Sequence, residues 1–260
     1  MTGSDAKVVV VTGASRGIGR GIARGFGAAG YRVVLAARDA AALEEAAAEA
    51  RAAGAPDTLC LPGDLREADR PAAVVEAAVA RFGRLDAIIS NAGATKRGDF
   101  LTLTDDDMLD GFALKYHAAV RLCRAAWPHL RASGGSIVGI SGIGAHTPTA
   151  EFTIGAPVNA AVIAFMKALA DRGRAEGVRV NTICPGAIAT ERLHRRIATL
   201  AARDGLSLEA AEEAMRRDMG VSRFGSPDDI AAMAVFLCSD QGAYVHGATI
   251  DVDGGIRPGV

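Results

Sequence analysis

The chain has 260 residues, of which 50% are hydrophobic and 23% charged, and its formal net charge is -1 at pH 7. A chain of this size can bury a large core within one α/β domain. Its balanced charge, without basic runs among aromatic residues, excludes a nucleic-acid surface. We therefore expect a single domain over residues 1–260 that acts on a small-molecule substrate.

Short apolar runs rich in Val and Ile alternate with helical patterns along the whole chain. The runs predict strands buried on both faces, at residues 7–12, 32–37, 58–62, 86–90, 136–141, 178–184 and 248–252. Apolar residues at helical spacing predict helices at residues 16–30, 39–54, 70–83, 105–134, 157–177 and 227–239. Strand–helix alternation with right-handed crossovers predicts an α/β fold, a doubly wound Rossmann-like sheet of seven parallel strands with helices on both faces.

One segment, at about residues 186–221, lies outside this alternation. It is charged and rich in Ala, and it follows the carboxyl end of a strand, where such folds bind ligands. We interpret it as an insertion that covers the substrate, with a plain pair of surface helices as the alternative.

The four cysteines show no CxxC spacing, so we expect buried free thiols, a reducing compartment and no metal site. Neither the N-terminus nor any apolar run has the pattern of a signal peptide or a membrane span. These features predict a cytoplasmic protein without a membrane partner.

A glycine-rich turn, "VVVVTGASRGIGRGIA", joins the first strand to the first helix. Glycine in such a turn lets the backbone approach a pyrophosphate, whose charge is met by amide N–H groups and by the helix dipole. This placement predicts a dinucleotide site formed by Gly13, Ser15, Arg16, Gly17, Ile18 and Gly19.

With four further motifs, this turn resembles the short-chain dehydrogenase/reductase family over residues 7–255. The motifs are TGxxxGIG at 12–19, "GDL" at 63–65, "NAG" at 91–93, "RVN" at 179–181 and the PGxIxT pattern at 185–190. The resemblance implies that Asp64 and Leu65 contact the adenine and that Asn91, Ala92 and Gly93 line the cofactor. It implies that Pro185, Gly186, Ile188 and Thr190 hold the nicotinamide carboxamide.

Charge at the end of the second strand favours NADP over NAD. An acidic residue there would bind both ribose hydroxyls, but Ala37 ends that strand, Arg38 follows it, and Arg16 lies in the glycine turn. Two guanidinium groups favour a 2'-phosphate. The role of Asp39 stays open, because its carboxylate could either pair with Arg38 or cap the next helix.

In the family that the chain resembles, hydride transfer uses an Asn-Ser-Tyr-Lys tetrad. Counting from fixed motifs places these four positions at Lys115, Gly142, Gly155 and Asn159. All four depart from the tetrad, so the chain is expected to be an atypical member. Pro157 favours a helix that begins beside Gly155, which would make Gly155 a pre-helix residue.

Lys115 is one of only four lysines in the chain, against 25 arginines. We hypothesise that it reaches into space left free by Gly142 and Gly155 and there binds the ribose or polarises a carbonyl. The alternative is a surface lysine or one in a subunit contact. His146, Ser141 and Asn159 are the other catalytic candidates, and Glu151 and Thr153 are possible from their location alone.

Two functions follow from these residues. The first is an NADP-dependent oxidoreductase for a carbonyl or alcohol with a non-standard proton donor. The alternative is a catalytically degenerate NADP-binding protein that serves as a sensor or as a subunit of an assembly. The resemblance also implies a homotetramer or, less readily, a homodimer.

Overall fold

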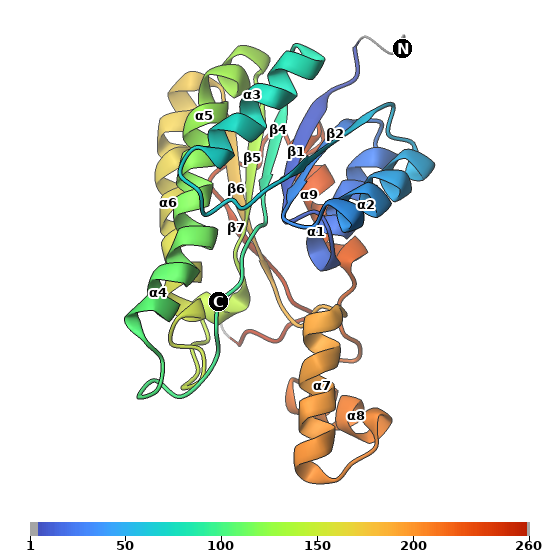
Figure 1. The fold of residues 1–260 in the computed structure, drawn as a ribbon, viewed down its shortest axis with the longest axis vertical. Helices are drawn as coiled ribbons and strands as arrows, with labels where there is room; N and C mark the ends of the chain where they lie inside the picture. Colours follow the sequence, from blue (N-terminus) through green and yellow to red (C-terminus); the bar gives the residue numbers. More distant parts are fainter. Residues whose placement is uncertain (1–4, 259–260) are drawn as a thin grey trace.

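The computed structural model describes residues 5–258, which form one seven-stranded parallel sheet between two layers of helices (Figure 1). The strands are Val8–Thr12 (β1), Arg32–Ala37 (β2), Thr58–Pro62 (β3), Ala87–Ser90 (β4), Ser136–Ile140 (β5), Arg179–Pro185 (β6) and Thr249–Val252 (β7). Their order in the sheet is β3-β2-β1-β4-β5-β6-β7. This confirms the predicted doubly wound sheet. The strand order reverses between β1 and β4, and such a reversal opens a crevice at the carboxyl ends.

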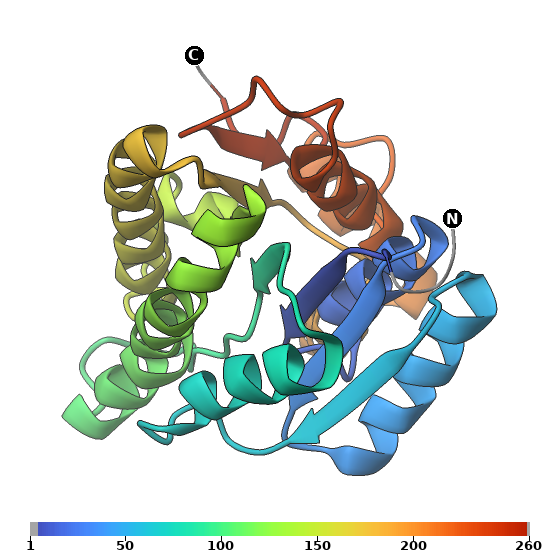
Figure 2. The same cartoon turned by 90° about the horizontal axis from the view of Figure 1, so that it is seen from above.

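Two hydrophobic clusters hold the helices on the two faces of the sheet. On one face pack Gly17–Ala28 (α1), Ala40–Ala53 (α2) and Pro227–Cys238 (α9), through residues such as Phe26, Leu43 and Leu237. On the other face pack Arg70–Phe82 (α3), Ala118–Ser133 (α5) and Gly155–Glu176 (α6), through residues such as Leu122 and Met166. The view from above shows the sheet enclosed between these layers (Figure 2).

The helix predicted over residues 105–134 is divided by a single π-helical turn. Asp105–Phe112 (α4) begins with a capping box between Thr104 and Asp107, and the π turn spans Ala113–His117 (η1) before α5. A π turn holds one extra residue within a helix and is frequent at functional sites. Here it carries Lys115.

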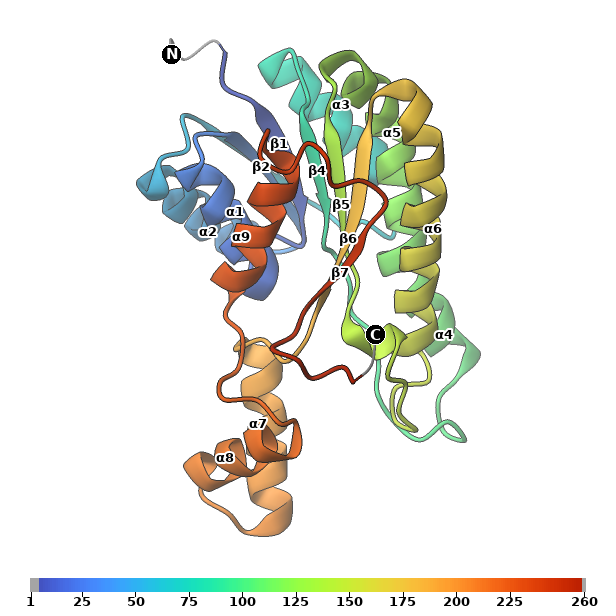
Figure 3. The same cartoon turned by 180° about the vertical axis from the view of Figure 1, so that it is seen from behind.

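The segment inserted after β6 forms two helices, Glu191–Asp204 (α7) and Leu208–Asp218 (α8). They project from the body of the protein beyond the carboxyl ends of the strands, as Figure 3 shows from behind. Leu193, Ile197 and Met215 form a small core within the pair. The pair is therefore held together by its own apolar contacts.

All four cysteines are free thiols, and Cys123, Cys184 and Cys238 are buried, as the sequence predicts. No helix within residues 5–258 is both long enough and apolar enough to cross a membrane.

Candidate active site

The glycine turn after β1 has a backbone that only glycine readily adopts. Gly13 and Gly17 have φ angles of 65° and 54°, and a Cβ on Gly19 would lie 2.1 Å from the carbonyl oxygen of Gly13. Arg16, the N-cap of α1, makes no side-chain cap hydrogen bond, and the first turn holds no acidic residue. The N–H groups of that turn are therefore available to an anion such as a pyrophosphate, which fits a dinucleotide.

The "NAG" motif connects the ends of β1 and β4. Thr12 Oγ1 accepts hydrogen bonds of 3.0 Å from the backbone N–H groups of Asn91 and Ala92. The Asn91 amide donates to the carbonyls of Thr12 at 2.9 Å and Gly13 at 3.3 Å. Asn91 therefore fixes the shape of the glycine turn, and Gly93 faces the cavity described below.

The residues expected to contact the adenosine lie at the ends of β2 and β3. Asp39 accepts a hydrogen bond of 3.1 Å from the N–H of Ala42 and so caps α2 instead of pairing with Arg38. Arg38 is exposed. Asp64 is held by an ion pair of 3.2 Å with Arg66, while Leu65 is buried.

A cavity of about 640 Å³ opens at the carboxyl ends of the strands. The four residues expected around the nicotinamide line it, together with Ile18 of the glycine turn: Pro185, Gly186, Ile188 and Thr190. The Thr190 methyl group lies beside Gly17, where it would contact an added Cβ at 3.3 Å. The PGxIxT segment therefore packs against the glycine turn.

Lys115 reaches this cavity from the π turn. Its Nζ donates hydrogen bonds of 2.6 Å to Oδ1 of Asn159 and 3.0 Å to the carbonyl of Ser141, and its methylene groups cross Gly93, where a Cβ would lie 2.8 Å from Lys115 Cδ. Burial, and secondly the positive charge of Arg192, lower the pKa of Lys115 to about 8. An ammonium group has three N–H donors, so one remains for a ligand.

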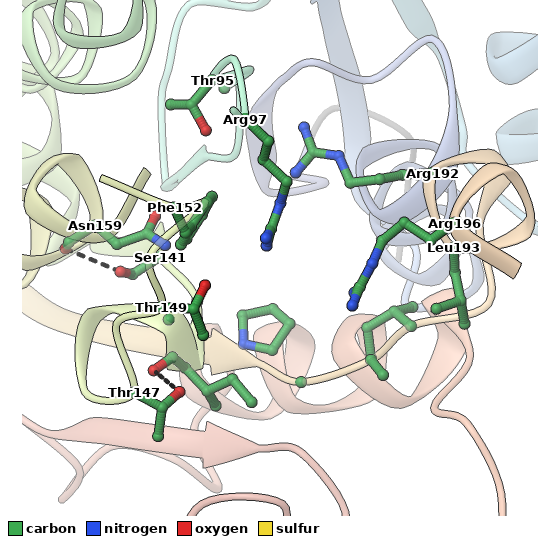
Figure 4. A pocket seen from close by; sticks show the side chains of 18 of the residues that line it. Thr95, Arg97, Ser141, Thr147, Thr149, Phe152, Asn159, Arg192, Leu193 and Arg196 are labelled. Atoms are coloured by element: carbon green, nitrogen blue, oxygen red, sulfur yellow. Dashed lines mark hydrogen bonds between the residues drawn. The ribbon is translucent and has the colours of Figure 1, made fainter. Parts of the chain in front are cut away.

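Ser141 and Asn159 contact Lys115, whereas His146 is directed elsewhere. The Ser141 hydroxyl donates a 3.0 Å hydrogen bond to the backbone carbonyl of Asn159, which points it into α6 (Figure 4). Gly142 faces the Asn159 amide, 3.1 Å from where its Cβ would be. His146 is exposed and does not line the cavity.

His146 lies beside Cys184 and Asp251, with one potential metal-ligand atom from each residue within 4.8 Å of the others. Asp251 already pairs with Arg257 at 2.8 Å. Burial raises the pKa of the Cys184 thiol, which favours the protonated form that does not bind metals. The other carboxylate oxygen of Asp251, Oδ1, is buried without a hydrogen-bond partner among the described residues.

The space beside Gly155 is filled, and this differs from the sequence-based expectation. Gly155 is the first residue of α6 instead of a pre-helix residue. A Cβ on it would lie 1.9 Å from Cε2 of Phe152, and one on Gly144 would lie 2.6 Å from Cε1 of the same ring. The two glycines thus admit the Phe152 ring, not Lys115.

Three cavity residues carry positive charge and were not among the catalytic or cofactor-binding candidates. Arg97 comes from the loop after β4, and Arg192 and Arg196 come from α7; all three direct their guanidinium groups toward the same open space (Figure 4). Arg97 stacks on Phe152, with Cζ 4.0 Å from the ring centroid. The sequence signal for Arg192 and Arg196 is the positive charge of the segment inserted after β6, whereas the direction of Arg97 depends on the path of its loop.

A family model described as enoyl-(acyl carrier protein) reductase matches residues 13–257. The chain is 37% identical to the L-fucose dehydrogenase of Oryctolagus cuniculus, over 97% of this chain and 86% of that protein. It is 33% identical to the L-rhamnose-1-dehydrogenase of Scheffersomyces stipitis, over 98% of each.

Among solved structures, the L-sorbose reductase of Gluconobacter frateurii complexed with NADPH and L-sorbose superposes with a TM-score of 0.93, at 33% identity over 98% of both chains. The motifs, the sheet and these matches agree over nearly the whole length. The chain therefore belongs to the short-chain dehydrogenase/reductase family.

Proposed function

We propose that the protein is an NADP-dependent oxidoreductase that transfers hydride between the cofactor and a carbonyl or hydroxyl carbon of a small polar molecule. Lys115 serves as the proton donor. The observation that carries this proposal is the position of its ammonium group, which faces the cavity with one free donor between the strand ends and α6. The relatives act on L-rhamnose and L-fucose, and the solved neighbour binds L-sorbose, which supports a polar substrate.

NADP is favoured over NAD by the adenosine end of the crevice. Asp39, the residue best placed to repel a 2'-phosphate, is engaged as a helix cap. Arg38 is exposed and makes no ion pair within 4.0 Å among residues 5–258, whereas Arg16 pairs with Glu191 at 3.9 Å. A free guanidinium group suits a phosphate in bidentate fashion.

A nicotinamide cofactor supplies the hydride when it is bound, and the residues of this chain handle the proton. Asn159 and the Ser141 carbonyl orient the ammonium group so that its third N–H points to the substrate oxygen. With a pKa of about 8, Lys115 is protonated at pH 7 and yet donates readily. In the reduction it gives a proton to the oxygen of the carbonyl, and in the oxidation the neutral amine takes it back.

This arrangement is proposed to replace the family tetrad. Lys115, Gly142, Gly155 and Asn159 stand at the counted tetrad positions, and Phe152 occupies the space beside Gly155. A lysine with a pKa near 8 supplies an acid where a tyrosine would otherwise act.

The second candidate is an NADP-binding protein without catalysis. The Phe152 ring favours it, because it takes space in which a tyrosine of the tetrad would act. NADPH binding without turnover across a panel of ketoses, aldoses, simple ketones and oxo acids would favour this candidate.

Substitution of Lys115 by Met tests the proposal. We expect a loss of turnover of at least about a hundredfold, the usual contribution of a general acid, with retained NADPH affinity. Lys167→Met is the matched control, because Lys167 is exposed and donates to the carbonyl of Gly247 on another part of the fold. Equal turnover in wild type and Lys115→Met would refute the role of Lys115.

The segment 186–221 is proposed to cover the bound substrate, because Leu193 and Met219 of this segment line the cavity. The single domain over residues 1–260, the homotetramer and the cytoplasmic location stay predictions.

A further inference from the structure

The cavity wall opposite Lys115 is formed by cations. Arg192 and Arg196 are four residues apart on α7, so they share one face of the helix, and Arg97 approaches from the loop after β4 (Figure 4). Arg195, on the same helix, does not line the cavity. The three guanidinium groups therefore converge from two separate segments.

No carboxylate among residues 5–258 pairs with any of these three arginines, whereas other arginines nearby are paired. Arg203 and Arg223 bind Asp204 and Asp229 at 2.6 and 2.7 Å. Burial and then the charges of Arg196 and Arg192 lower the pKa of Arg97. Glu151 is the one carboxylate on the described cavity wall; it makes no ion pair within 4.0 Å, and its charge only partly offsets the lowering of the pKa of Arg97. Like charges so close repel one another, and a bound anion relieves that repulsion.

Arg97 is held in an orientation suited to an oxyanion. Its guanidinium group stacks on the Phe152 ring, which is itself confined between Gly144 and Gly155. Stacking occupies the flat face of a guanidinium group and leaves its N–H edge free for bidentate contact with a carboxylate or phosphate.

We propose that the cavity binds a substrate bearing a carboxylate or phosphate group, which Arg97 and Arg196 hold with support from Arg192. This rests on the proposed function, because the carbon that reacts would lie toward Lys115 while the anion lies toward α7. Figure 4 shows these two sides, with Ser141 and Asn159 facing Arg192 and Arg196 across the cavity. The substrate is thus an acidic hydroxy or oxo compound.

Equilibrium binding of probe anions tests this independently of turnover. Malonate, inorganic phosphate and neutral malonamide are titrated calorimetrically into the full-length protein saturated with NADP. We expect malonate or phosphate to bind and malonamide not to bind. The anion with the lower Kd shows whether the site prefers a carboxylate or a phosphate.

Arg97→Gln and Arg196→Gln are each expected to weaken the binding of that anion at least about tenfold, with the Kd of NADPH kept within threefold. Arg195→Gln is the matched control and should change the anion affinity less than twofold. The proposal is overturned if neither anion binds, if Arg195→Gln has an equal effect, or if the two variants weaken NADPH instead, which would assign the arginines to the cofactor phosphates. A protein that binds malonate but reduces no carbonyl compound would retain this inference and refute the proposed activity.

Discussion

The ammonium group of Lys115 donates a 2.6 Å hydrogen bond to Oδ1 of Asn159, a residue 44 positions later in the chain. The contact joins the π turn after α4 to the first turns of α6, and both lie at the carboxyl ends of the strands. The two residues form one unit at the base of the cavity. Its chemistry depends on the charge state of Lys115.

The rate of reduction is expected to fall as the pH rises through about 8, the lowered pKa of Lys115. The ammonium form donates the proton and disappears above this pH, so oxidation should show the opposite trend. The kcat/KM for NADPH-dependent reduction, measured from pH 6 to 10, reports this group in the free enzyme.

Arg192→Gln should move that break to higher pH, because the charge of Arg192 contributes to the lowered pKa of Lys115. Arg195→Gln should leave it in place. A break at the same pH in wild type and Lys115→Met would assign it to another group.

The partly buried Lys115 leads to a prediction about stability. The pKa of Lys115 is about 8 in the folded chain, against 10.5 for an unperturbed lysine, so between these values the unfolded chain binds more protons. The free energy of unfolding contributed by Lys115 should therefore rise with pH in that window, by up to about 1.4 kcal/mol per pH unit. Well below pH 8 Lys115 is charged in both the folded and the unfolded chain. Its destabilising contribution to the free energy of unfolding therefore no longer changes with pH.

Urea unfolding of wild type and Lys115→Met at pH 7.5 and pH 9.5 measures this contribution. The wild type should gain stability relative to the variant at the higher pH. Lys167→Met should track the wild type at both values. A constant difference between wild type and Lys115→Met would contradict the lowered pKa.

Much of the fold was predictable because its signals are local. Short apolar runs predicted all seven strands, and the glycine turn required backbone angles that leave few alternatives. The π turn at Ala113–His117 was not predictable, because one extra residue in a helix hardly changes the spacing of its apolar residues. Helix predictions over 39–54, 70–83 and 227–239 were within one residue at each end.

The candidate site was less predictable where its side chains come from loops, as with Arg97 and Phe152. Sequence counting brought Lys115, Gly142 and Asn159 together, and the structure places them in contact. The same counting left the space beside Gly155 empty, because the path of the loop that carries Phe152 is set by tertiary packing. Arg97 reaches the cavity for the same reason.

Cofactor choice is expected to depend on Arg38. Arg38→Gln should weaken NADPH binding at least about tenfold, since a charge-assisted pair with the 2'-phosphate is lost, and should leave NADH within twofold. The Kd values of both cofactors, from nucleotide fluorescence, test this. Arg131→Gln at the far end of α5 is the control. Equal weakening of NADPH and NADH would remove the argument for a phosphate contact.

The fit between Phe152 and Gly155 is expected to be tight enough that one methyl group disrupts it. Gly155→Ala places a Cβ 1.9 Å from the ring and must displace it, with a cost of about 1–3 kcal/mol in the free energy of unfolding. Phe152→Ala removes the obstacle, so the double variant should recover most of the loss that Gly155→Ala causes. A double-mutant cycle by urea unfolding measures this coupling. Additive effects would mean that Phe152 and Gly155 do not compete for the same space, and Arg97 would then lose the confined ring on which it stacks.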